Sequence, residues 1–158
     1  MILRAATVAD ALAVETVRVD TWKVAYRGLL PDSLLDGLTV DAHRRAAGII
    51  AGSSTTLLAL EGPHPVGMAA YGPCRDDDLD GSELYALYVL PRAWRSGTGT
   101  AMLAACGDVT SLWVLEGNAR AIAFYARHGF SFDGVRKDKD LGGPVVELRM
   151  VRSLGWGA

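Results

Sequence analysis

The sequence predicts an α/β (α+β) fold in which one mixed sheet carries helices on both faces. Strand-like and helix-like runs are interleaved in the order strand, helices, three strands, helix, strand, helix, two strands, which is typical of that class. Residues 83–115 read as strand, helix and strand, and such a crossover makes its two strands parallel. Residues 55–61 and 66–71 flank a Gly-Pro-His-Pro turn and are expected to form an antiparallel hairpin.

The N-terminal half supplies the first strand and most of the helices. After a short strand, Thr7 and Asp10 form a capping pair that opens a long amphipathic helix. Apolar residues three and four positions apart continue this helix until Gly28, and Pro31 can begin the next one. The expected elements are a strand at residues 2–5, helices at 11–26 and 41–50, and a short helix between them.

The C-terminal half supplies the remaining strands and two helices. Pro91 ends a buried apolar strand, because proline cannot donate to a sheet ladder. An acidic stretch before this strand is expected to be a solvated loop without a function, and a polar stretch near the end another loop. The expected elements are strands at 83–90, 111–115, 130–136 and 145–151, helices at 101–106 and 118–128, and loops at 74–81 and 137–140.

The composition is that of one globular domain spanning residues 1–158. The net charge of −2 argues against a nucleic-acid partner, which usually requires a basic surplus. Two cysteines, Cys74 and Cys106, and three scattered histidines indicate neither a disulfide framework nor a metal site. No apolar run reaches the ~18 residues of a membrane span, and no signal peptide opens the chain. We therefore expect a cytoplasmic protein without a membrane partner.

The stretch at residues 92–100 has the character of a phosphate-binding turn. It lies between a strand and a helix, where the N–H groups of the turn and of the first helical turn point at one spot. Gly97 and Gly99 let the backbone approach a ligand without a Cβ clash. A pair of glycines is weak evidence alone, but its place in the chain makes a phosphate-bearing ligand the favoured interpretation.

Two other side chains, Tyr125 and Glu83, have the right chemistry for an active site. In the helix at 118–128, Phe124 is expected in the core, whereas a buried Tyr125 hydroxyl would still need a partner. Glu83 stands at the head of the central strand, where its carboxylate is either exposed or placed in a cleft. The sequence does not decide between these two alternatives.

Several motifs together resemble the GNAT superfamily of N-acetyltransferases. They are ELYALYVLP, P-x-x-W-x-x-G-T-G-x-A-x-L and LWVLEGNARAIAFYARHGF, and TWKVAYRGLLP resembles one branch of that family. The resemblance covers most of the chain and implies a mostly antiparallel sheet with a central, splayed parallel strand pair. It also implies acetyl-coenzyme A (acetyl-CoA) as the donor and a primary amine as the acceptor, with no metal.

The resemblance assigns cofactor-binding residues in three places. The splayed strand offers backbone groups to the pantetheine arm, the glycine turn holds the pyrophosphate, and the last helix adds two side chains. Trp94 stands where the family carries Gln or Arg, so we expect Arg95 beside it to supply that charge. The implied residues are Leu87, Tyr88 and Val89 in the strand, Arg95, Ser96, Gly97, Thr98, Gly99 and Thr100 in the turn, and Asn118 and Tyr125 in the helix.

The resemblance also implies direct attack of the amine in a ternary complex. An alkyl ammonium of pKa ~10 must lose a proton before it can attack, and Glu83 is the expected base, acting through water. Tyr125 matches the family's general acid, which protonates the departing thiolate. Trp22 and Tyr26 either line the acceptor pocket or serve as plain packing between helix and core.

Two rival functions and the acceptor stay open at this point. A nucleotide-binding module would need a third glycine where Met102 stands, or a lysine after Gly99. A non-catalytic acyl-CoA sensor would keep the fold and lose the chemistry. The acceptor is a small molecule or a peptide, and the acidic residues 76–78 either attract a cationic amine or are only solvated. Whether the chain forms a homodimer is equally open.

Overall fold

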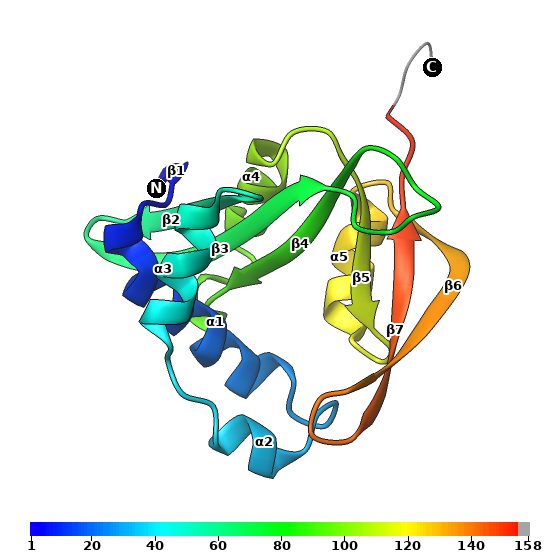
Figure 1. Cartoon of the computed structure of the whole chain (residues 1–158), viewed down its shortest axis with the longest axis horizontal. Helices are drawn as coiled ribbons and strands as arrows, with labels where there is room; N and C mark the ends of the chain where they lie inside the picture. The colour runs from blue at the N-terminus through cyan, green and yellow to red at the C-terminus, as the bar shows by residue number, and fades with distance from the viewer. Residues whose placement is uncertain (155–158) are drawn as a thin grey trace.

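The computed structural model describes residues 1–154 and contains one seven-stranded sheet (Figure 1). The strand order is β1-β2-β3-β4-β5-β7-β6. Every neighbouring pair is antiparallel except β4 and β5, which are parallel. The strands are β1 (Ile2–Ala5), β2 (Thr55–Glu61), β3 (His64–Pro73), β4 (Ser82–Val89), β5 (Val109–Leu115), β6 (Ser131–Asp140) and β7 (Pro144–Val151). This confirms the predicted mostly antiparallel sheet with a central parallel pair.

Helices cover both faces of the sheet, as the sequence predicts. Buried apolar residues of α1 pack with β2 and β3 on one face, and those of α4 and α5 pack with β4 and β5 on the other. Figure 1 shows α1 and α3 in front of the sheet and α4 and α5 behind it. The helices are α1 (Ala11–Ala25), α2 (Asp32–Asp36), α3 (Ala42–Ala51), α4 (Thr98–Ala105) and α5 (Ala119–Arg127), with single 3₁₀ turns η1 (Val8–Asp10) and η2 (Pro91–Ala93).

The two parallel strands separate soon after they meet. Residues 82–84 of β4 pair with residues 109–112 of β5, and the register ends there. On the other edge of β4, Ala70 pairs with Ala86 and Tyr71 with Leu84, so Tyr85 is the extra residue of a β-bulge. A bulge bends its strand and increases the local twist. The bend therefore directs the C-terminal half of β4 away from β5, which confirms the predicted splay.

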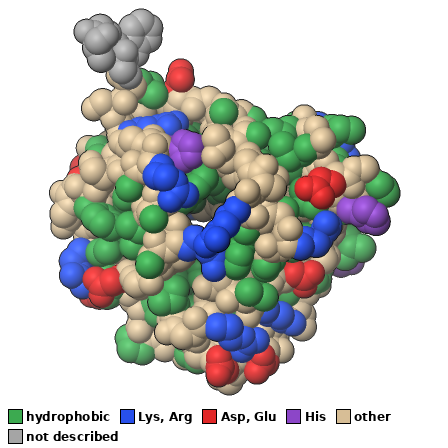
Figure 2. All heavy atoms as spheres, turned by 180° about the vertical axis from the view of Figure 1, so that it is seen from behind, with side chains coloured by type: hydrophobic (Ala, Val, Ile, Leu, Met, Phe, Trp, Pro, Cys, Tyr) green, Lys and Arg blue, Asp and Glu red, His purple; other side chains and the backbone are tan. Residues whose placement is uncertain are grey.

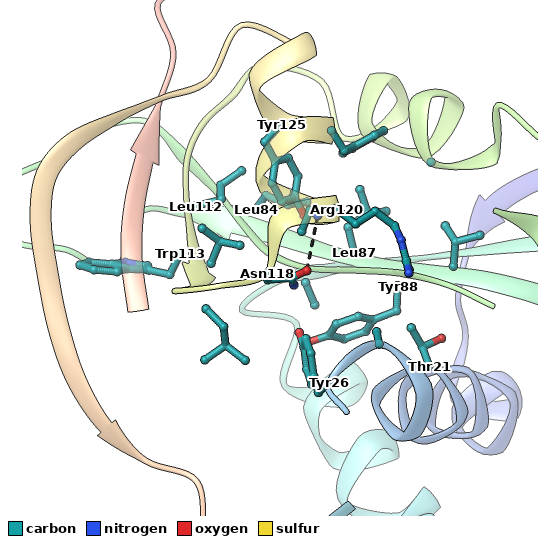
Figure 3. A pocket seen from close by; sticks show the side chains of 18 of the residues that line it. Thr21, Tyr26, Leu84, Leu87, Tyr88, Leu112, Trp113, Asn118, Arg120 and Tyr125 are labelled. Atoms are coloured by element: carbon teal, nitrogen blue, oxygen red, sulfur yellow. Dashed lines mark hydrogen bonds between the residues drawn. The ribbon is translucent and has the colours of Figure 1, made fainter. Parts of the chain in front are cut away.

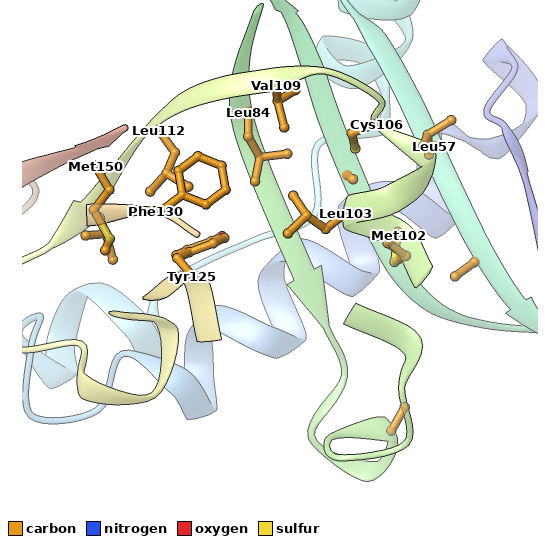
Figure 4. Packing of buried hydrophobic residues seen from close by; sticks show 14 of the residues in the cluster. Leu57, Leu84, Met102, Leu103, Cys106, Val109, Leu112, Tyr125, Phe130 and Met150 are labelled. Carbon is orange, nitrogen blue, oxygen red and sulfur yellow. The ribbon is translucent and has the colours of Figure 1, made fainter. Parts of the chain in front are cut away.

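The larger hydrophobic core lies between the sheet and the pair α4 and α5. Figure 4 shows Tyr125 and Phe130 beside Leu112 and Met150 at one end of this cluster, with Leu103 and Met102 of α4 at the other. Tyr125 and Phe130 meet edge to face with 5.9 Å between ring centroids, which is a favourable aromatic geometry. Tyr125 is thus part of the core as well as a site candidate.

Two expected loops differ from the structure. Residues 137–140 belong to β6, because they pair with residues 144–147 of β7 and Lys137 and Lys139 reach Glu147 across the ladder. The acidic loop is also held down: buried Arg149 donates to both oxygens of Asp78 at 2.7 Å, and Trp113 donates to Asp76 at 3.0 Å. Residues 74–81 form a mostly exposed loop, as predicted, but Asp76 and Asp78 have a structural role that the sequence did not indicate, because they neutralise Arg149 in the sheet.

The remaining differences concern element ends. The helix expected at 101–106 begins earlier, at Thr98, because the Ala101 N–H already bonds to the Gly97 carbonyl at 3.0 Å. The hairpin strand expected at 66–71 extends to His64 and Pro73. Within residues 1–154, no helix is both long and apolar enough to cross a membrane.

Candidate active site

A cavity of about 840 Å³ lies where β4 and β5 separate. One end faces the glycine turn and α5, and the other faces α1 and the β6–β7 hairpin. Figure 3 shows side chains from both ends converging on the C-terminal half of β4. The cavity thus places the glycine turn, the splayed strand and the aromatic residues of α1 at one connected space.

The backbone of β4 offers unpaired polar groups to this cavity. The Leu90 N–H donates to the Val66 carbonyl at 2.8 Å, so Leu90 and Tyr88 direct their backbone groups to β3. Because successive residues of a strand alternate, the backbone groups of Leu87 and Val89 point the other way, into the splay. Trp94 Nε1 already donates to the Val89 carbonyl at 2.7 Å. The Leu87 N–H and C=O and the Val89 N–H are the groups left to a ligand.

The glycine turn has the backbone geometry of an anion cradle. Gly97 has φ = 85° and stands as the N-cap of α4, while Arg95 has φ = 63°. A non-glycine residue in this region is strained and is held there by its surroundings. Positive φ at both positions turns the chain so that the first N–H groups of α4 face the cavity mouth.

The residues of the turn divide into two groups. Arg95, Gly97, Gly99 and Thr100 line the cavity. The side chains of Ser96 and Thr98 lie outside it: the Ser96 hydroxyl donates to the Ala93 carbonyl at 2.5 Å and lies 2.8 Å from the Thr98 hydroxyl. Of the predicted cofactor-binding residues, Ser96 and Thr98 therefore use their side chains to build the turn, which leaves only their backbone groups for a ligand.

Trp94 and Arg120 form a stack that the sequence did not reveal. The Arg120 guanidinium lies 3.3 Å from the centroid of the Trp94 ring, within cation–π range. Desolvation and then the charge of Arg95 lower the pKa of Arg120 from its usual value. Arg95 and Arg120 thus place two like charges near the cavity mouth, and Arg120 rests on the Trp94 indole.

This end of the cavity carries uncompensated positive charge. Arg95, Arg120 and Arg127 line it, and among residues 1–154 none of them has a carboxylate oxygen within 4.0 Å. Figure 2 shows Lys and Arg side chains around the opening at the centre of this face. The one sequence signal for Arg120 was its position two residues after the helix-capping Asn118.

The last helix brings Asn118 and Tyr125 to the cavity. The Asn118 side chain accepts a hydrogen bond from the Ala121 N–H at 3.4 Å and so caps α5. Tyr125 is 9% exposed and lines the cavity. Burial raises the pKa of its phenol, with smaller contributions from Tyr88 and Cys106. The hydroxyl therefore keeps its proton over the physiological range.

Phe124 differs from the expectation that it points only into the core. Its ring lines the cavity and lies where a Cβ at Gly99 would come within 3.4 Å of two ring carbons. It also contacts His128, with 4.7 Å between ring centroids. Phe124 therefore packs α5 against the turn, in contact with the backbone of Gly99.

Glu83 lies in the cleft, which settles the alternatives left by the sequence. The residue is 1% exposed and lines the cavity. Its carboxylate accepts hydrogen bonds from the Arg75 backbone N–H at 3.0 Å, from Nε at 3.2 Å and from Nη2 at 2.7 Å. Cys74, Asp76 and Glu83 place ligand atoms within 4.8 Å of one another, but arginine side chains already neutralise both carboxylates of this group.

Trp22 and Tyr26 both line the cavity and pack in the core. They line the cavity and also pack with Leu30, Leu35 and Leu115 in a small core cluster. Their rings meet edge to face at 4.9 Å. Burial is the main cause that raises the pKa of Tyr26 and of the neighbouring Tyr88, so both phenols stay protonated at this end of the cavity.

The sequence missed the charged residues of the acceptor end. Lys137, Lys139 and Glu147 line the cavity from β6 and β7, and Arg75 lines it from the loop before β4. Lys137 Nζ lies 4.0 Å from the centroid of the Trp113 ring. The expected loop at 137–140 hid this arrangement, since only a strand directs Lys137 and Lys139 to the same side.

Comparison with known proteins places this architecture in a family. The family model described as "Acetyltransferase (GNAT) family" matches residues 25–130. A probable N-acetyltransferase of Mycobacterium tuberculosis, Rv2775, is 30% identical to this chain and covers 96% of it, with 94% of the relative aligned.

Two solved structures have the same fold. A ribosomal-protein-alanine N-acetyltransferase from Brucella melitensis is 26% identical with a TM-score of 0.73, covering 98% of this chain and 100% of that one. The PaiA N-acetyltransferase from Thermoplasma acidophilum, solved in complex with coenzyme A, also has a TM-score of 0.73, with 16% identity over 96% of this chain and 98% of that one. The chain therefore belongs to the acetyltransferase (GNAT) family and is an N-acetyltransferase.

Proposed function

We propose that this chain moves an acetyl group from acetyl-CoA to a primary amine by direct attack in a ternary complex. The observation that carries the proposal is the splay, which joins an anion-binding turn to free backbone groups of β4 and to a buried, protonated tyrosine. A substrate with phosphates at one end and an amide-rich arm leading to a thioester suits this order of groups. The coenzyme A bound to the PaiA structure supports the same choice of donor.

Donor binding is assigned to three sets of residues. The α4 N-terminus with Gly97 and Gly99 binds the pyrophosphate, and Arg95 and Arg120 add positive charge to it. Leu87 and the Val89 N–H hydrogen-bond to the pantetheine arm, as a strand would. Asn118 and Tyr125 face the arm from α5. In this assignment Trp94 is a positioning residue, because it fixes both Arg120 and the Val89 carbonyl.

The transfer forms a C–N bond, breaks the C–S bond, and returns one proton to sulfur for the one lost by the amine. Bound acetyl-CoA supplies an acyl thioester with a thiolate leaving group. A backbone N–H of the splayed strand stabilises the oxyanion that attack creates. Tyr125, which is protonated at neutral pH, donates its proton to the sulfur as the C–S bond breaks and negative charge develops there.

Glu83 is proposed as the base, acting through water. Arg75 engages both carboxylate oxygens, but each oxygen has a second lone pair that can accept from a water molecule. The nearby guanidinium also fixes the orientation of the carboxylate. Glu83 is thus both positioned and buried at the acceptor side of the thioester site.

The proposal is tested by ligand stabilisation and by release of free thiol. Acetyl-CoA should raise the melting temperature, because a ligand that binds only the native state stabilises it, while NAD and ATP should have little effect. An amine panel with acetyl-CoA should then release coenzyme A thiol in proportion to N-acetylated product. Stabilisation by acetyl-CoA without any thiol release would favour the non-catalytic sensor, and stabilisation by NAD alone would favour the nucleotide-binding module.

A further inference from the structure

The acceptor end of the cavity has a charge pattern that selects among amines. It contains three cations, Arg75, Lys137 and Lys139, and two carboxylates, Glu83 and Glu147. These five side chains together carry a net charge of +1, which is the surplus positive charge of this end. We propose that the acceptor amine also carries a carboxylate, so that the enzyme uses amino-acid-like amines in preference to polyamines. This inference rests on the proposed acetyl transfer.

Both carboxylates at this end lie beside cations, although the buried Glu147 Oε1 has no hydrogen-bond partner among the described residues. Glu83 is 1% exposed and receives three hydrogen bonds from Arg75. Glu147 Oε1 lies 3.0 Å from Lys139 Nζ and 3.8 Å from Lys137 Nζ. A diamine or a polyamine would place its second ammonium beside these two lysines, whose charges outnumber that of Glu147, and like charges at such distances repel.

The neighbouring acidic loop does not change this balance. Both oxygens of Asp78 accept from Arg149 at 2.7 Å, and Asp76 accepts from Trp113 at 3.0 Å and from Arg149 at 3.4 Å. Arg149 is itself buried at 4% exposure, so these acids are committed to a charge inside the sheet. Asp77 and Asp80 of this loop are exposed, but neither lines the cavity.

Lys137 is the group best suited to receive the acceptor's carboxylate. Its Nζ rests over the Trp113 ring at 4.0 Å and lies 3.8 Å from Glu147, which is beyond hydrogen-bond distance. An ammonium has three donors, so Lys137 retains donors for a ligand. The aromatic rings of Trp22 and Tyr26 line the same end and supply apolar contact for the carbon chain between the amine and the carboxylate.

The positive surplus has a second consequence at the reacting nitrogen. Nearby cations disfavour a charged ammonium and lower its pKa, which raises the fraction of neutral, nucleophilic amine. A polyamine bound here would bring additional positive charge that opposes its own docking. An amino acid brings a carboxylate that offsets the surplus.

The test compares matched amines of equal chain length at several lengths, for example 4-aminobutanoate, butylamine and 1,4-diaminobutane. Thiol release from acetyl-CoA gives kcat/KM for each. We expect the amino acid to exceed the diamine by at least about tenfold, as one charge-assisted contact permits. Lys137→Gln should raise KM for the amino acid by about tenfold with little change in kcat. It should lower KM for the diamine, because one repelling charge is removed, and it should leave the affinity for acetyl-CoA unchanged.

Arg136→Gln is the matched control, because it removes a positive charge from the same strand outside the cavity, where Arg136 pairs with Glu116 at 3.4 Å. It should alter neither KM. A diamine preferred over the amino acid at every chain length would overturn the inference while leaving the proposed transfer intact. An absence of turnover with every amine, despite stabilisation by acetyl-CoA, would instead overturn the proposed function and this inference with it.

Discussion

Replacing Arg120 by glutamine tests whether the cation stacked on Trp94 binds the phosphates of coenzyme A. The change removes the charge and keeps most of the side-chain length. One hydrogen bond to a charged group contributes about 1.5–3 kcal/mol. Arg120 is exposed at the cavity mouth, so solvent screening reduces the contribution of this hydrogen bond to the lower end of that range. We therefore expect the Kd for coenzyme A to rise by about tenfold.

The assay is isothermal titration of coenzyme A and of pantetheine, which lacks the phosphates. Only coenzyme A should lose affinity in Arg120→Gln, since pantetheine would contact β4 and α5 but not the turn. Arg44→Gln is the control, because Arg44 is an exposed arginine of α3 outside the cavity. Equal losses of affinity for both ligands would mean that Arg120 affects the binding of the pantetheine arm and not that of the phosphates. An unchanged Kd for coenzyme A would refute the reasoning.

Three further changes probe the catalytic residues and the buried thiol. Tyr125→Phe removes only the hydroxyl, so the steady-state turnover number should fall at least about tenfold, which corresponds to ~1.4 kcal/mol of activation free energy. The affinity for coenzyme A and the melting temperature should be nearly unchanged. Full turnover in this variant would make Tyr125 a packing residue. Glu83→Gln should lower the rate by about 10²-fold, mainly at low pH where free amine is scarce, and an unchanged pH–rate profile would assign Glu83 to holding Arg75. Burial raises the pKa of Cys106 from 9.0 to about 11, so the unfolded chain loses this proton first and the free energy of unfolding should fall as the pH rises through that window. Urea melts of Cys106→Ala should lack this part of the slope, whereas an identical slope would place its origin elsewhere.

Much of the fold could be predicted because most elements carry a clear apolar period. The strand at 55–61 matches the structure because it is a short, continuous buried run bounded by turn residues. The helix ending before Gly28 matches closely because Val14, Val17 and Thr21 are buried three and four positions apart. The C-terminal half of β6 could not be recognised in this way. It is an edge strand with mostly exposed, charged residues, and its partner β7 supplies the pairing that the local sequence does not indicate.

The residues of the candidate site show the same contrast between local sequence information and contacts made by distant segments. Residues within one continuous motif, such as Gly97, Gly99 and Asn118, could be predicted as site candidates because their local backbone geometry follows from the motif. Contacts between distant segments could not. The stack of Arg120 on Trp94 depends on how α5 packs against the turn, and the pairing of Arg75 with Glu83 depends on the path of a loop.

The short pairing of β4 with β5 makes the sheet two half-sheets joined by three residue pairs, Ser82 with Val109, Glu83 with Ser111 and Leu84 with Leu112. A ligand seated in the splay would hydrogen-bond to β4 on one side and contact α5, which follows β5, on the other. It would act as a short substitute strand that cross-links the two halves. Backbone amides of Leu87 and Val89 should then exchange with solvent more slowly in the complex, and product release would require the halves to separate again.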